Sequence, residues 1–150
     1  MDISEKGLKL IQEFEGCRLI PYNDSVGYAT VGVGHLIGKR KVTADDLAKY
    51  KGFTDADALR LLKEDVSGFV KSLNTLLSSP VTQNQFDAMV SLAFNIGVGN
   101  FTKSSVLRFT NAKEFDRAAE AFKSWNKAGG KVLTGLTNRR LKESQLYKGM

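Results

Sequence analysis

Apolar residues recur at helical spacing along much of the chain. The longest such stretch, residues 55–77, has apolar positions three and four residues apart at Leu59, Leu62, Val66, Phe69, Leu73 and Leu76. At 1.5 Å per residue, a helix of this length would extend about 34 Å. The pattern therefore predicts a rod long enough to join two lobes of a small protein.

Capping signals mark where other helices begin. Asp2-Ile3-Ser4-Glu5 predicts a helix over about residues 3–15 that Gly16 ends, and Thr43-Ala-Asp-Asp46 predicts a short helix before Lys51-Gly52. Thr82-x-x-Gln85 precedes an almost wholly apolar helix. Further helices are expected over residues 105–109, 112–125 and 136–147, with a Gly-Gly loop at 129–130 between the last two.

Only residues 18–34 read as β structure. Branched and aromatic residues are interrupted there by Asn23-Asp24-Ser25 and Gly27, which predicts strand, turn and strand. In the second strand Tyr28 and Thr30 share one face, while Ala29 and its alternate neighbours share the other. We expect the alanine face to be core and the threonine face to be open.

Composition is that of one compact globular domain. The 150 residues are 42% hydrophobic and 25% charged, and the single cysteine, Cys17, excludes an intramolecular disulfide. We expect Cys17 to be a small buried apolar residue. No apolar stretch has the length of a membrane span or the form of a signal peptide.

The net charge of +6 lies in the second half of the chain. Residues 1–75 hold eleven basic and eleven acidic residues, whereas residues 76–150 hold eleven and five. Such an excess favours a polyanionic partner, either nucleic acid or a cell-wall polymer, although a solvated basic surface explains it equally well. Among the basic residues, we expect Arg139 and Arg140 to bind an anionic partner.

Two carboxyl groups in contrasting surroundings can support glycoside hydrolysis, which needs one acid and one base. Glu15 would lie at the negative end of the first helix, which favours the protonated acid, and Asp24 would lie in a polar turn, which favours the carboxylate. A hydroxyl at Thr30 could hold the attacking water beside Asp24. Residues of these types are also common on surfaces, so this pattern alone leaves catalysis open.

A family resemblance adds to this interpretation. Glu15-Gly-Cys-Arg-Leu, Tyr22-Asn-Asp-Ser-Val-Gly27 and Thr30-Val-Gly-Val-Gly-His35 closely resemble the active-site signature of T4-type phage lysozymes. Residues 83–90, 93–101 and 125–136, followed by Arg139-Arg140 and Glu143, are similar to the lambdoid and P22-like branch. The resemblance implies that Glu15 is the acid, Asp24 the base and Thr30 the water-holding residue. It also makes Leu36, Phe94 and Ser104 candidate substrate contacts, and it suggests that His35 pairs with Asp65.

The fold that this resemblance implies is the α+β, two-lobed lysozyme fold in a single domain. Lobe 1 would comprise about residues 14–54, the joining helix about 55–77, and lobe 2 about 80–150 together with the helix over 3–15. The substrate cleft would lie between the lobes. Thr134 and Cys17 depart from the family pattern outside the catalytic set.

The implied function is that of an endolysin muramidase that cuts peptidoglycan by inversion, with no metal or cofactor. The family also implies a monomer without a membrane anchor, held in the host cytoplasm until a membrane pore, a holin, releases it to the wall; nucleic acid would not be its partner. Two alternatives stay open: a basic helical module that binds polyanions, including DNA, without catalysis, and a hydrolase of chitin or chitosan.

Overall fold

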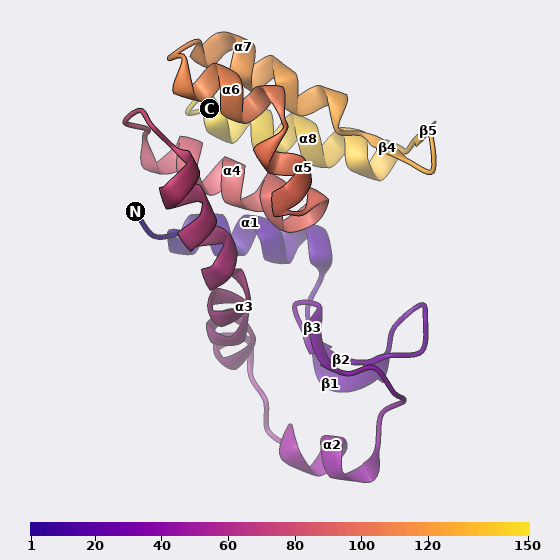
Figure 1. The fold of residues 1–150 in the computed structure, drawn as a ribbon. Coiled ribbons are helices and arrows are strands. Elements are labelled where there is room, and N and C mark those ends of the chain that lie inside the picture. The colour runs from indigo at the N-terminus through magenta and orange to yellow at the C-terminus, as the bar shows by residue number, and fades with distance from the viewer. The chain divides into compact units, whose positions relative to one another are not determined.

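The computed structural model describes residues 1–150, which divide into two compact units. One unit is Leu8–Asp65, and the other combines Met1–Gly7 with Val66–Met150. The division falls within helices α1 (Glu5–Glu15) and α3 (Asp55–Leu76), so both helices contribute residues to both units. Figure 1 shows the elements of each unit. The expected mixture of α and β structure is confirmed.

The unit Leu8–Asp65 contains a three-stranded antiparallel sheet in the order β1 (Arg18–Asn23), β2 (Ala29–Gly32), β3 (His35–Gly38). Strand β2 is central, and Thr30 lies opposite Tyr22 on one side and Leu36 on the other. The third strand was not expected from the sequence. It forms because Val33 and Gly34, with Gly34 at φ 67°, turn the chain back directly after β2.

Helix α2 (Ala44–Lys49) starts where its cap predicts. The Thr43 side chain accepts a hydrogen bond from the Asp46 backbone N–H, and the Asp46 carboxylate accepts one from the Thr43 N–H. Arg40 donates two further hydrogen bonds to this carboxylate, at 2.6 and 3.0 Å. Asp46 therefore joins the cap to the segment that follows β3.

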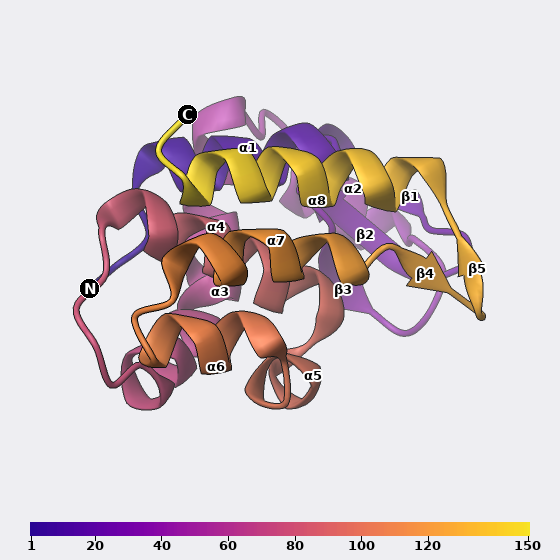
Figure 2. The ribbon, with the colours of Figure 1, turned by 90° about the horizontal axis from the view of Figure 1, so that it is seen from above.

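The larger unit is built around helix α4 (Gln83–Ile96), whose residues Gln85 to Ala93 are all buried. Helix α4 begins with the expected capping box of Thr82 and Gln85. It packs against α8 (Thr134–Tyr147), while α6 (Ser105–Asn111) packs against α7 (Phe115–Ala121), as Figure 2 shows from above. None of the helices combines the length and the apolar character needed to cross a lipid bilayer.

Three features of this unit differ from the sequence expectation. The helix predicted over 112–125 begins at Phe115, because Lys113 adopts φ 61°, and it ends in a short 3₁₀ turn, η1 (Phe122–Ser124). A short helix, α5 (Val98–Thr102), follows α4. A two-stranded hairpin, β4 (Lys127–Ala128) and β5 (Lys131–Val132), occupies the segment expected to be a loop.

The first residues of the chain are held by residues far along the sequence. Ser4 donates its backbone N–H to Asp87 at 3.0 Å and also contacts the same carboxylate through its hydroxyl. Gln83 donates to the Asp2 carbonyl and to Asp87, at 2.9 and 2.8 Å. Ser4 also caps α1, since its hydroxyl accepts a hydrogen bond from Gly7. Helix α1 thus begins two residues later than predicted.

Arg139 and Arg140 are not surface residues, which corrects the expectation that they bind an anionic partner. Their exposed fractions are 5% and 0%, and both face Glu143, which is also fully buried. The Arg140 Nε and Glu143 Oε1 atoms are 2.7 Å apart, in a charge contact that is not aligned as a hydrogen bond. Burial raises the pKa of Glu143 and lowers that of Arg140, while their mutual attraction opposes both shifts.

Candidate functional site

Asp24 lies in the five-residue turn between β1 and β2, and this turn fixes its carboxylate. The Asp24 Oδ1 atom accepts backbone N–H bonds from Val26 at 3.0 Å and from Tyr28 at 2.8 Å. The Asp24 backbone bonds to Tyr28 and Gly27, and Gly27 adopts φ 87°, a conformation that favours glycine. Both side-chain bonds use Oδ1, so Oδ2 accepts none within the protein. The half-buried carboxylate is therefore oriented by its own turn.

Thr30 occupies the centre of the sheet, and its surroundings differ from those expected. Ala29 and Val31 are fully buried, as predicted, but Thr30 is also buried, with 4% of its surface exposed. The prediction of an open threonine face is wrong, because β2 is a central strand whose four residues are all buried. The Thr30 hydroxyl donates to the Tyr28 carbonyl at 2.9 Å. Thr30 is thus tied to the residue that also orients Asp24.

Glu15 is the last residue of α1 and is exposed. The helix ends there because Gly16 adopts φ 77° and returns its N–H to the Gln12 carbonyl at 2.8 Å. Only Gly16 and Cys17 separate the helix from β1. The three candidate catalytic residues, Glu15, Asp24 and Thr30, therefore belong to one compact unit, Leu8–Asp65.

The three candidate substrate contacts have different surroundings. Leu36 is 45% exposed on β3, directly opposite Thr30. Phe94 is half-buried in the other unit, where its ring packs edge-on against Phe69 with the centroids 5.5 Å apart. Ser104 is buried and caps α6, since its hydroxyl accepts the Leu107 N–H and donates to the Phe101 carbonyl. Of the three, Leu36 presents the most accessible side chain.

His35 connects β3 to α3, as the sequence resemblance predicts. Its Nδ1 atom lies 3.0 and 2.9 Å from the two carboxylate oxygens of Asp65. The prediction of a His35–Asp65 pair is confirmed. Because His35 adjoins Leu36 and lies on the strand paired with Thr30, the pair helps to hold β3 in register beside the candidate site.

Cys17 is half-buried rather than fully buried, and its sulfur lies 3.7 Å from an Asp55 carboxylate oxygen. Burial, with a smaller contribution from the Asp55 charge, raises the pKa of the thiol. The thiol form is thereby favoured over the reactive thiolate. No three His, Cys, Asp or Glu side chains come together in a way that could hold a metal ion.

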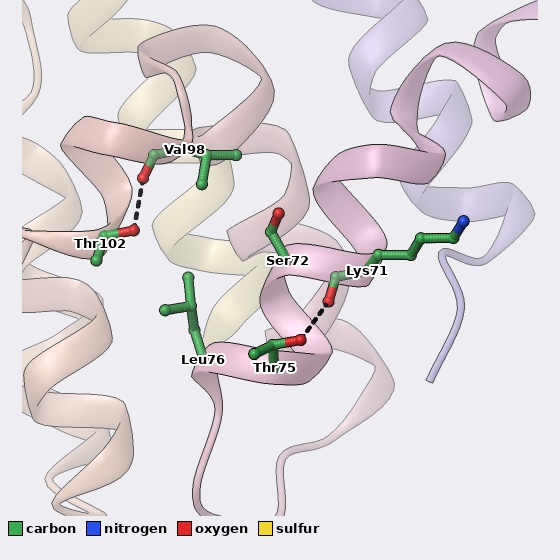
Figure 3. A pocket seen from close by; sticks show the side chains of 6 residues that line it. All are labelled: Lys71, Ser72, Thr75, Leu76, Val98 and Thr102. Carbon is green, nitrogen blue, oxygen red and sulfur yellow. Dashed lines mark hydrogen bonds between the residues drawn. The ribbon is translucent and has the colours of Figure 1, made fainter.

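A hollow of about 290 Å³ lies between α3 and α5 (Figure 3). It is lined by Lys71, Ser72, Thr75, Leu76, Val98 and Thr102. The two threonine hydroxyls donate to carbonyls of their own helices, Thr75 to Lys71 and Thr102 to Val98. The hollow contains none of the candidate catalytic or substrate-contacting residues.

Residues 12–143 match the family model described as phage lysozyme. The chain belongs to the phage lysozyme family. The matched region includes Glu15, Asp24 and Thr30 as well as Phe94 and Ser104, so the family's sequence pattern extends over both units. The expected family and fold class are thereby confirmed.

Individual members and structures support this membership. The endolysin of Salmonella phage P22 is 41% identical over 147 residues, which are 98% of each chain, and a P22 lysozyme variant of known structure superposes with a TM-score of 0.85 at 39% identity, covering 99% of both chains. The muramidase domain of SpmX from Asticaccaulis excentricus superposes with a TM-score of 0.81 at 37% identity, covering 97% of both chains. The endolysin of Bacillus phage B103 is 40% identical over 98% of this chain, which spans only 54% of that relative's length.

Proposed function

We propose that this lysozyme-family chain is a muramidase. It would hydrolyse the β-1,4 bond between N-acetylmuramic acid and N-acetylglucosamine in bacterial peptidoglycan. The proposal is supported by similarity to a P22 endolysin along almost the whole chain and to a domain named as a muramidase. The structural observation that carries it is the Asp24 carboxylate, oriented by the Val26 and Tyr28 N–H groups in the same unit as Glu15.

In this mechanism Glu15 is the acid and Asp24 the base. Glu15 donates its proton to the glycosidic oxygen as the bond from that oxygen to the anomeric carbon breaks. A water molecule attacks the anomeric carbon and gives a proton to Asp24. A proton must then pass from Asp24 to solvent and another from solvent to Glu15 before the next turnover. No metal or cofactor takes part in these steps.

The bonding of Thr30 supports an inverting reaction. Its O–H is already donated to the Tyr28 carbonyl, so the Thr30 oxygen can act toward a water molecule only as an acceptor. Asp24 also accepts. A water that donates one hydrogen to each group would direct its lone pair away from both of them, toward the sugar. We therefore propose that Asp24 activates water and does not attack the sugar itself, with carboxyl groups about 6.5–9.5 Å apart.

Substrate contacts are proposed at Leu36, Phe94 and Ser104. Leu36 has the strongest structural support, because its exposed side chain lies directly across from Thr30 in the sheet. Phe94 would contribute the part of its ring that Phe69 leaves uncovered. Ser104 would act mainly through its cap of α6, since its hydroxyl is already bonded twice within the protein.

The biological setting is proposed on family resemblance. The chain would accumulate as a monomer in the host cytoplasm, pass through a membrane pore made by a separate protein, and lyse the host by cutting its wall. The endolysin name of the P22 relative supports a role in lysis.

Product analysis of digested sacculi tests the reaction directly. A muramidase produces new reducing ends on muramic acid, and inversion produces the α-anomer first, which NMR detects before mutarotation. Anhydro ends would instead indicate a lytic transglycosylase, and retained configuration would contradict the inverting step. Loss of viscosity from soluble chitosan without release of wall fragments would favour the chitosanase alternative.

Two isosteric variants test the catalytic pair. Glu15→Gln removes the proton donor, and Asp24→Asn removes the base but keeps an oxygen that can accept the Val26 and Tyr28 N–H bonds. We expect each to lower the rate at least about 100-fold while leaving the unfolding midpoint nearly unchanged. Glu13→Gln and Asp45→Asn are matched controls, since both are exposed carboxyl groups in the same unit. Similar losses in the controls would contradict the assignment.

A further inference from the structure

The β4–β5 hairpin extends beyond the neighbouring ends of α7 and α8 in both views of the fold (Figure 1 and Figure 2). Its two-residue turn is Gly129-Gly130, with φ 58° and 78°, which is the backbone form that best matches the twist of a hairpin. At its base, Leu133 donates to the Asn126 carbonyl at 3.0 Å and Asn126 donates to Thr137. The hairpin is therefore a defined structure with an anchored base.

Buried groups reinforce that base. Arg140 donates to the Trp125 carbonyl at 3.3 Å, immediately before the hairpin, and to Asn95 on α4 at 2.9 Å. The Trp125 backbone N–H bonds to Phe122 in η1. These contacts connect the start of the hairpin to the fully buried Arg140–Glu143 pair, so its position relative to α8 is held from inside the unit.

The hairpin displays positive charge that no acidic residue neutralises. Residues 121–142 include six Lys and Arg and no Asp or Glu. The two arginines are buried against Glu143, and Lys123 pairs with Glu120. Lys127 and Lys131 are exposed and make no side-chain hydrogen bond or ion pair. Lys127 and Lys131 of the hairpin therefore carry much of the exposed positive charge of residues 121–142.

Each face of the hairpin combines a lysine with an apolar side chain. Cross-strand partners point to the same face, so Lys127 lies beside Val132 and Lys131 lies beside Ala128. Val132 is 60% exposed and the following Leu133 is 44% exposed. The lysine ammonium group can pair with a carboxylate of a ligand, while the aliphatic side chain beside it contacts apolar groups or rings next to that carboxylate.

We propose that the β4–β5 hairpin, residues 127–133, binds carboxylates of the peptide stems of peptidoglycan, through residues other than the candidate catalytic Glu15 and Asp24. This proposal deepens the proposed muramidase function, since it names a second contact with the same polymer. The hairpin would hold the wall through Lys127 and Lys131 without contributing to bond cleavage.

The arrangement favours a polymer over a membrane surface. Binding at a bilayer surface grows with the apolar area that a segment buries in the membrane, and the tip here, Gly129-Gly130, has no side chains to bury. The larger apolar residues, Val132 and Leu133, lie toward the base, and the two lysines lie on opposite faces. Charges on both faces match a flexible network of strands better than a flat sheet of headgroups.

Binding can be measured without cleavage by sedimenting the full chain with purified, teichoic-acid-free sacculi in the Glu15→Gln background. We expect Lys127→Gln with Lys131→Gln to weaken binding about two- to thirtyfold, the range for two exposed ion pairs. Lys71→Gln with Lys103→Gln is the matched control, with two exposed lysines of the same unit and the same change in net charge. Val132→Thr, which keeps the side-chain shape, tests the apolar contribution and should weaken binding less.

Chemical modification of the wall tests whether carboxylates are the groups that the hairpin binds. Amidation of the wall carboxylates should lower binding of the parent to the level of the Lys127→Gln/Lys131→Gln variant. High salt should reduce the difference in binding between the parent and this variant. The proposal is overturned if the control pair loses as much binding as the hairpin pair, or if the hairpin effect persists on amidated sacculi. It is also overturned if the hairpin pair affects binding only to phosphatidylglycerol vesicles.

The muramidase proposal fails separately. If the chain with Glu15 intact releases no reducing ends while the hairpin pair still weakens sedimentation with sacculi, the activity is wrong and the wall contact stands. If reducing ends appear and the hairpin variants bind as well as the control, only the wall contact is wrong.

Discussion

Gly7 and Gly68 both lie in helices, yet we expect alanine at these positions to change stability in opposite directions. An alanine Cβ at position 7 would lie 2.8 Å from Asp87 Cγ and 2.8 Å from Ile3 Cγ1. At position 68, on α3, it would meet nothing within 4 Å. The two substitutions make the same chemical change, so the surroundings decide the outcome.

The magnitudes follow from this geometry. Alanine in place of glycine within a helix gains at most about 1 kcal/mol of stability. At position 7 the clash costs about 1–3 kcal/mol, because Asp87 is fully buried and cannot move without losing its bonds to Ser4 and Gln83. Bonds to a carboxylate are worth about 1.5–3 kcal/mol, so any displacement adds to the loss. We expect Gly7→Ala to destabilise the chain by about 2 kcal/mol and Gly68→Ala to stabilise it by up to about 1 kcal/mol.

Thermal unfolding followed by circular dichroism measures both variants. For a chain of this size, about 2 kcal/mol corresponds to a fall of about 4–8 °C in the midpoint, and Gly68→Ala should raise it by up to about 4 °C. Urea titration should change the midpoint without changing the slope. A Gly7→Ala variant as stable as the parent would mean that Asp87 can move away from α1 at no cost in stability, which would refute the prediction.

Three other predictions test the candidate site and the buried charges. Thr30→Val should lower the rate of wall hydrolysis about 100-fold, whereas Thr30→Ser should retain most of it; equal losses in steady-state assays would argue against a role for the hydroxyl. The Arg40 side chain and the Thr43 backbone N–H hold the pKa of Asp46 below its ordinary value of 3.8, so the stability that this carboxylate contributes is present at neutral pH and is lost as the pH falls below about 4. Urea titrations should therefore show an Asp46→Asn deficit at pH 7 that shrinks by pH 3; a deficit independent of pH would contradict the pairing. Arg140→Gln should cost about 3–5 kcal/mol because it removes one of the two arginines that balance the buried Glu143 carboxylate. The exposed Lys142→Gln should change stability little, and calorimetry showing equal midpoints for the two variants would refute this.

Local signals in the sequence predicted much of the fold. The caps at Thr43 and Thr82 form where expected, since each depends on residues within one helical turn. The helix predicted over residues 55–77 appears as α3 because its apolar repeat continues from Leu59 to Leu76, about five turns. The turn that holds Asp24 was predicted for the same reason, since its signals are equally local.

Features that depend on distant partners were not predictable in this way. Charge counting could not reveal that Arg139 and Arg140 are buried. They pair with Glu143 on the same helix, α8, and α8 packs against α4, which lies about fifty residues earlier in the sequence. The alternation of residue types along a strand shows which side chains share a face, but it does not show whether other parts of the protein cover that face. For this reason the sequence could not predict that Thr30 is buried. The Gly129-Gly130 pair is typical of a hairpin turn, but it is also common in irregular loops, so it did not predict the β4–β5 hairpin.

The division of the chain into units has a consequence for synthesis on the ribosome. Residues 8–65 are contiguous, so every side chain of that unit has been made once residue 65 emerges. The other unit is discontinuous, since Ser4 and Asp87 are 83 positions apart in sequence. Ser4 must wait for its Asp87 partner until α4 is translated, whereas the segment carrying Glu15, Asp24 and Thr30 needs no later partner for its sheet. Nascent chains should therefore acquire the sheet first and secure their own N-terminus afterwards.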